Sequence, residues 1–137
     1  MATFNKFNSF VEALAEKVHN LGSDSLKVAL CAAANAPTSS NTVLANLTEI
    51  SYTNCSTRAL TVSASSQTSG TYKLVITDLV LTASGTVGPF RYVVLYNDTA
   101  TSDELIGYYD YGADVTLASG ETFTIDFDGS GGVLTIA

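Results

Sequence analysis

The stretch DFDGSGG near the C-terminus, residues 126–132, has the residue types and spacing closest to a metal-binding loop. Two carboxylates one residue apart, followed by glycines, open the calcium loop of helix–loop–helix proteins, which also needs a glutamate at its twelfth position. Counting from Asp126 reaches Ala137 without meeting that glutamate. We therefore predict that Asp126 and Asp128 flank a glycine hairpin turn between two strands. A weak calcium site built from loop oxygens is the alternative.

Residues for nucleophilic or acid–base catalysis are sparse. His19 is the only histidine, and we expect it at the surface or at a helix end, where its charge suits the helix dipole. Cys31 lies in the apolar run KVALCAAA, which favours a reduced, buried thiol, whereas Cys55 has polar neighbours. A glycosidase-like pair of carboxylates could come only from acids near strand ends, which are commonly solvated. These acids are Asp103, Glu104, Asp110, Asp114 and Glu121.

The sequence therefore predicts a protein without catalytic residues, metal site or cofactor. The formal net charge of −7 and the scattered positions of the six cations argue against binding to a nucleic acid backbone. No apolar run reaches the length needed to span a membrane. The start MATFNKFNSF lacks the basic and apolar blocks of a secretory signal, so we expect synthesis in a cytoplasm.

The one helical pattern lies at residues 9–21. Apolar residues at spacings of three and four form one stripe, Ser9 and Glu12 match a capping box, and Gly22 supplies a stop signal. We predict that this stripe packs against the chain's own sheet, with pairing between subunits as the alternative. The stripe consists of Val11, Leu14, Val18 and Leu21.

The rest of the chain follows a strand pattern. A strand is predicted in LKVALCAA, followed by a long polar loop over residues 35–56 that is a candidate contact arm. Further strands are predicted at residues 57–65, 71–83, 90–98, 104–112, 121–129 and 132–137, with turn-rich clusters between them. In ETFTIDF the apolar residues Phe123, Ile125 and Phe127 should point to one face and the polar residues to the other, whereas FRYVVLY is apolar on both faces apart from Arg91, as expected for a central strand. This order predicts a single domain, residues 1–137, of mainly β class. We expect an antiparallel β-sandwich or barrel, of the jelly-roll or immunoglobulin-like kind, with one N-terminal α-helix.

Aromatic residues are the best candidates for contact with another molecule. Tyrosines in LIGYYDYG suit a protein interface or sugar stacking if exposed, and sheet packing if buried. Two phenylalanines stand in the N-terminal segment ahead of the predicted helix, where a free terminus would expose them. The candidate interface residues are Phe4, Phe7, Tyr108, Tyr109 and Tyr111.

Three long segments resemble small structural proteins of tailed bacteriophages. They are FNSFVEALAEKVHNLGSDSLKVAL, SGTYKLVITDLVLTASGTVGPFRYVVLYNDTAT and LIGYYDYGADVTLASGETFTIDFDGSGGVLTIA, which together cover most of the chain. GPFRYVVLYND and YYDYG are the most specific parts. These segments resemble scaffold features and imply no catalytic residue.

Among phage virion proteins, the resemblance best fits a capsid decoration, or cement, protein. Such a protein is small, single-domain and often trimeric, and it clamps the outer shell of a head. The resemblance thus implies a homo-oligomer, with the major capsid protein of the phage head as partner and the virion as location. A tail or adhesion component that binds a host surface glycan is the alternative. A carbohydrate-active enzyme is the third possibility, and the missing catalytic set argues against it.

Overall fold

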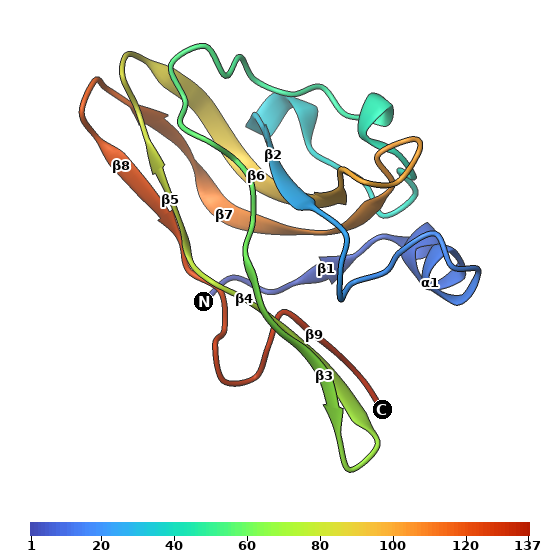
Figure 1. Cartoon of the computed structure of the whole chain (residues 1–137). Helices are drawn as coiled ribbons and strands as arrows, with labels where there is room; N and C mark the ends of the chain where they lie inside the picture. The colour runs from blue at the N-terminus through green and yellow to red at the C-terminus, as the bar shows by residue number, and fades with distance from the viewer.

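The computed structural model describes residues 1–137, and the fold is mainly β with antiparallel sheets and one short helix near the N-terminus, as predicted (Figure 1). Two short 3-10 turns, η1 (Ala33–Asn35) and η2 (Leu44–Asn46), interrupt the long loop. The regular elements are β1 (Asn5–Lys6), α1 (Asn8–Ala15), β2 (Leu26–Cys31), β3 (Val62–Thr68), β4 (Thr71–Ile76), β5 (Leu79–Thr82), β6 (Val87–Asn97), β7 (Leu105–Leu117), β8 (Thr122–Ile125) and β9 (Leu134–Ile136).

The strands form three antiparallel sheets. The largest has four strands in the order β1-β7-β6-β2, and it is joined by a three-stranded sheet, β3-β4-β9, and a two-stranded sheet, β5-β8. β6 pairs with β2 on one side and β7 on the other. Its sequence FRYVVLY is apolar on both faces apart from Arg91, and β6 is an inner strand of the sheet, as this pattern predicts.

The four-stranded sheet is covered on both faces. Side chains alternate along β2, so Val28 and Leu30 enter the main core while Ala29 and Cys31 enter a second, smaller cluster on the opposite face. The main core is closed by the other two sheets and by Phe10 of α1. The smaller cluster is covered by Leu44 and Leu47 of the long loop. The arrangement is sandwich-like, with the four-stranded sheet as its middle layer.

β8 shows the predicted alternation. Ile125 and the following Phe127 are buried in the main core, and Phe123 packs against it, while the intervening threonines and Asp126 are exposed. The predicted strand at residues 71–83 is divided at Thr77 and Asp78, where the chain leaves the three-stranded sheet for the two-stranded one. The Asp78 carboxylate accepts a hydrogen bond from the backbone N–H of Phe127 (2.8 Å) and holds the two crossing segments together.

The turn after β8 is not a hairpin, contrary to prediction. β8 pairs with β5 whereas β9 pairs with β4, so residues 126–133 link two different sheets. The Asp128 carboxylate accepts hydrogen bonds from the backbone N–H groups of Ser130 (2.9 Å) and Gly131 (2.7 Å). These bonds lower the pKa of Asp128 and make it a structural turn residue.

The helix is shorter than predicted, and only Leu21 of the four stripe residues is buried. α1 ends at Ala15 because Lys17 adopts a left-handed conformation (φ 70°), with backbone bonds from Lys17 to Leu14 and from Val18 to Ala13. This is a Schellman ending, in which a lysine occupies the position usually held by glycine.

Within α1, Val11 is 52% exposed because the buried residue of the helix is Phe10. Beyond the helix end, Val18 is 36% exposed and Leu21 is buried. The predicted capping box is also absent, since Phe7 is the N-cap and no side chain caps it. No helix of this chain has both the length and the apolar character that a membrane crossing requires.

The long loop is packed against the body of the domain, and its last part lies along the outer edge of β2. Backbone N–H groups of Ile50 and Leu60 donate to the carbonyls of Leu30 (3.0 Å) and Leu26 (2.9 Å). The Tyr52 hydroxyl accepts a bond from the Leu30 N–H (2.8 Å). The expected contact arm at residues 35–56 is thus an integral cover of the sheet edge.

Candidate contact surface

The N-terminal segment closes one edge of the four-stranded sheet with two aromatic pairs. Asn5 and Lys6 of β1 pair with Tyr108 and Gly107 of β7. Because consecutive strand residues point to opposite faces, the rings on either side of β1 reach opposite faces of the sheet.

Phe4 packs on Tyr109 (5.6 Å between ring centroids) and Phe7 packs on Tyr108 (5.2 Å). We call these four residues the aromatic clamp.

Glycine at position 107 makes room for the clamp. The ring of Phe4 and the backbone oxygen of Asn5 occupy the space that a side chain at this position would need. Gly107 faces the same side of β7 as Tyr109, so Phe4 lies over the glycine and against the tyrosine. The residue without a side chain thus lets β1 approach closely enough to pair.

The clamp accounts for four of the five candidate interface residues within the chain itself. Phe7 is fully buried, so the expectation that it contacts a partner is wrong. The reason is that Phe7 fills the smaller cluster beside Tyr108. Phe4, Tyr108 and Tyr109 are half-buried, and burial raises the pKa of Tyr109 to about 12. Only Tyr111 projects substantially into solvent, with 57% of its surface exposed.

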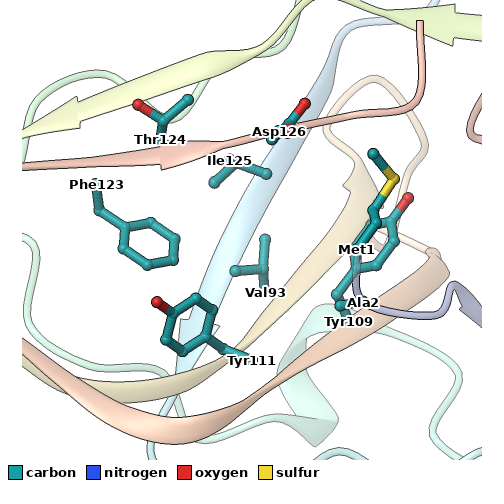
Figure 2. Close-up of a pocket in the computed structure, with 9 residues that line it drawn as sticks. All are labelled: Met1, Ala2, Val93, Tyr109, Tyr111, Phe123, Thr124, Ile125 and Asp126. Carbon is teal, nitrogen blue, oxygen red and sulfur yellow. The ribbon is translucent and has the colours of Figure 1, made fainter.

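Tyr111 stands at the side of an apolar hollow between β7 and β8. The hollow has a volume of about 190 Å³, and Figure 2 shows its walls. The rings of Tyr111 and Phe123 meet edge to face (5.2 Å), and Val93 of β6 lies beside them (Figure 2). The full lining is Met1, Ala2, Val93, Tyr109, Tyr111, Phe123, Thr124, Ile125 and Asp126. We call this the β7–β8 hollow.

The rim of the hollow is partly polar and partly apolar. Thr124 and Asp126 bring a hydroxyl and a carboxylate from β8 and the residue that follows it, and Met1 covers the opposite side at 82% exposure. Apolar walls with a few polar groups at the edge are typical of a binding surface. The hollow can accept an apolar side chain and offer a negative charge beside it.

The five carboxylates considered for acid–base chemistry are engaged elsewhere or apart from this hollow. Asp110 forms a bidentate pair with Arg91 across β6 and β7 (2.8 and 3.1 Å). The Arg91 guanidinium lowers the pKa of Asp110. Glu121 accepts a bond from the Ala118 N–H (2.7 Å) in the turn before β8, and Glu104 accepts one from the Ser102 N–H (3.3 Å). Asp103 and Asp114 belong to the β6–β7 turn and to β7.

His19 is buried, not at the surface as predicted. It is 5% exposed because its ring packs on Phe10 (5.3 Å) and its Nδ1 accepts a bond from the Asn97 amide (3.0 Å). The Asn97 amide also donates to Asp24 (2.7 Å), while its oxygen accepts bonds from the Thr99 and Ala100 N–H groups.

An amide nitrogen can only donate, so the His19 proton lies on Nε2 in the neutral ring. Burial lowers the pKa of His19, which opposes the raising effects of Glu104 and Asp24. His19 therefore ties the segment after α1 to the end of β6. It also lines a second, more open hollow of about 410 Å³ facing Ser65 and Tyr72.

Of the residues that line the β7–β8 hollow, the sequence indicated Tyr109 and Tyr111 as interface candidates but neither Phe123 nor Met1. The alternation of β8 predicted that Phe123 lies on the inner face of its strand. It could not show that Phe123 neighbours the tyrosines of β7, because this contact depends on how the sheets are arranged. Met1 carries no pattern at all. No family model matches the chain, and neither a curated protein nor a solved structure matches it.

Proposed function

We propose that this chain is a non-enzymatic structural protein of a bacteriophage virion, and specifically a capsid decoration protein that binds the major capsid protein on the head surface. The observation that carries the proposal is the β7–β8 hollow, where an exposed tyrosine and an exposed methionine border an apolar cavity. A solvated Tyr111 ring and Met1 side chain gain free energy when a partner covers them.

The chemistry of the rim specifies the partner segment. An apolar side chain fits into the hollow against the paired rings of Tyr111 and Phe123, and a basic or hydrogen-bond-donating residue fits opposite Asp126. GPFRYVVLYND and YYDYG, the segments that most resemble phage structural proteins, lie in β6 and β7, which line the hollow. This resemblance supports another protein of the virion as the partner. Repeated contacts on a shell turn a modest single affinity into tight attachment.

Binding to undecorated heads tests this proposal. Tyr111→Ser should weaken binding by about tenfold to hundredfold, because truncating an aromatic anchor at an interface removes on the order of 1.4 to 2.8 kcal/mol. Val11→Ser is the matched control, since Val11 is similarly exposed but lies on α1, which is distant from β8 (Figure 1) and contributes no residue to the hollow. Equal binding by both variants and the unaltered chain would overturn the proposed contact.

Adhesion to a host glycan is the second candidate function. An exposed aromatic ring beside a hydroxyl and a carboxylate, here Tyr111 with Thr124 and Asp126, also suits a sugar ring. Glycan binding by the isolated domain that Tyr111→Ser abolishes, with no binding to heads, would favour adhesion over decoration.

A further inference from the structure

β3 has an unprotected outer edge. It pairs only with β4, so along Val62–Thr68 the outward backbone N–H and C=O groups have no partner in the chain. Most of this segment is exposed, and it contains neither proline nor any charged side chain. Natural proteins normally protect an exposed edge with charges, proline or a covering segment, because such an edge pairs with other strands.

The long loop protects two other edges of this molecule. Residues 50–60 cover β2 through backbone bonds to Leu26 and Leu30. The Ser56 N–H donates to the Thr82 carbonyl (3.0 Å), and the Ser56 hydroxyl accepts from the Thr82 N–H (2.8 Å), which covers β5.

The remaining edges are short or charged. β1 and β9 have two and three residues. β8 is flanked by Glu121 and Asp126, and the part of β7 beyond β1 carries Asp110 and Asp114. β3 therefore differs from every other edge strand in having seven residues and no such protection.

Charge identifies what can pair with this edge. The chain carries 13 acidic and 6 basic residues, so two copies repel each other over most surfaces. Residues 61–72 contain no charged side chain and leave a place where two copies meet without repulsion. A partner strand that carries charges would find no opposite charge on this segment.

When two copies of one edge strand pair antiparallel about a twofold axis, the N–H and C=O groups of each strand face the C=O and N–H groups of the other. We infer that β3 pairs with β3 of a second copy, joining two three-stranded sheets into one six-stranded sheet.

The shape of the hairpin permits this pairing. The β3–β4 ribbon extends away from the four-stranded sheet (Figure 1), and it turns tightly at Ser69 (φ 51°) and Gly70 (φ 84°). A projecting ribbon brings two edges together before the bodies collide. Serine and threonine side chains opposite one another across the new pair add hydrogen bonds. The pairing is independent of what the β7–β8 hollow binds.

Sedimentation of the full chain over a range of concentrations tests the inference, with the mass of a dimer as the expected limit. Ser66→Lys places two like charges near the twofold axis and should shift the dissociation constant at least tenfold toward monomer. Thr122→Lys on β8 is the matched control, because it makes the same charge change on an exposed strand residue elsewhere. At concentrations low enough for the unaltered chain to be monomeric, both variants should melt like it.

Hydrogen exchange supplies an independent readout. Amides of residues 62–68 should become more protected as concentration rises, whereas those of β8 should not. A chain that stays monomeric at every concentration overturns the inference. So does an oligomer, including a trimer, that Ser66→Lys leaves intact, or concentration-dependent protection confined to another strand, which would indicate a different surface.

Discussion

At Gly107 the lack of a side chain lets the N-terminal segment cross the sheet edge and place Phe4 against Tyr109. Gly107→Ala should lower the free energy of unfolding by about 1–3 kcal/mol, the usual effect of overfilling a packed site. Thermal or denaturant unfolding measures the loss. Gly129→Ala is the control, since nothing lies within 4 Å of a side chain built there. If Phe4→Ala in the Gly107→Ala background recovers no stability, the clash is not with the ring.

His19 gives the molecule a definite response to acid. Burial lowers the pKa of folded His19 below its ordinary value of 6.5, so the unfolded chain takes up the proton at higher pH than the folded chain. The stability that neutral His19 contributes is complete above that ordinary value and falls as the pH drops below it. Once protonated, Nδ1 cannot accept the bond from the Asn97 amide.

Denaturant unfolding at about pH 8 and about pH 6, on either side of the ordinary histidine pKa, measures this response. The free energy of unfolding should be lower at the lower pH. In His19→Gln, which keeps an acceptor for Asn97 but does not titrate, the difference should shrink. An undiminished pH dependence in that variant would assign the effect to another group.

At the scale of elements, the last part of the long loop covers the outer edge of β2, and Tyr52 holds it there. The Tyr52 hydroxyl accepts from the Leu30 N–H (2.8 Å) and donates to Glu49 (2.7 Å), while Arg58 stacks on its ring. Tyr52→Phe leaves the Leu30 N–H unpaired and should reduce the free energy of unfolding by about 1–3 kcal/mol.

Tyr72→Phe is the matched control for this fastening, since the Tyr72 hydroxyl bonds only the Ser65 side chain (2.7 Å). Equal losses in the two variants, measured by denaturant unfolding, would contradict the fastening role of Tyr52.

The elements also show what sequence patterns can predict. Period-two alternation predicted β8 and the inner place of β6, because alternation and two-sided apolarity follow directly from which faces of a strand are buried. The helix end was missed because Lys17 takes a left-handed conformation that the pattern assigns to glycine. Val11 was predicted to be buried because helical spacing alone does not say which face of α1 meets the core.

The candidate site was predictable only in part. The sequence indicated that the tyrosines of β7 matter, and strand geometry separates Tyr108 from Tyr109. It could not show that Phe7 fills a cluster beside Tyr108 or that Asn97 holds His19, since both contacts join residues far apart in the chain. Such contacts depend on how the sheets are stacked, which local patterns do not encode.

At the scale of the whole molecule, this chain is a small acidic β domain whose aromatic clamp fixes the N-terminal segment and whose β7–β8 hollow is the proposed contact surface. The composition of purified virions of a phage that encodes this chain tests the proposed decoration role most directly. Quantitative gel or mass-spectrometric analysis gives the number of copies relative to the major capsid protein. If the chain is a decoration protein, its copy number per particle should be near that of the major capsid subunits. A handful of copies per particle, or none, would contradict it.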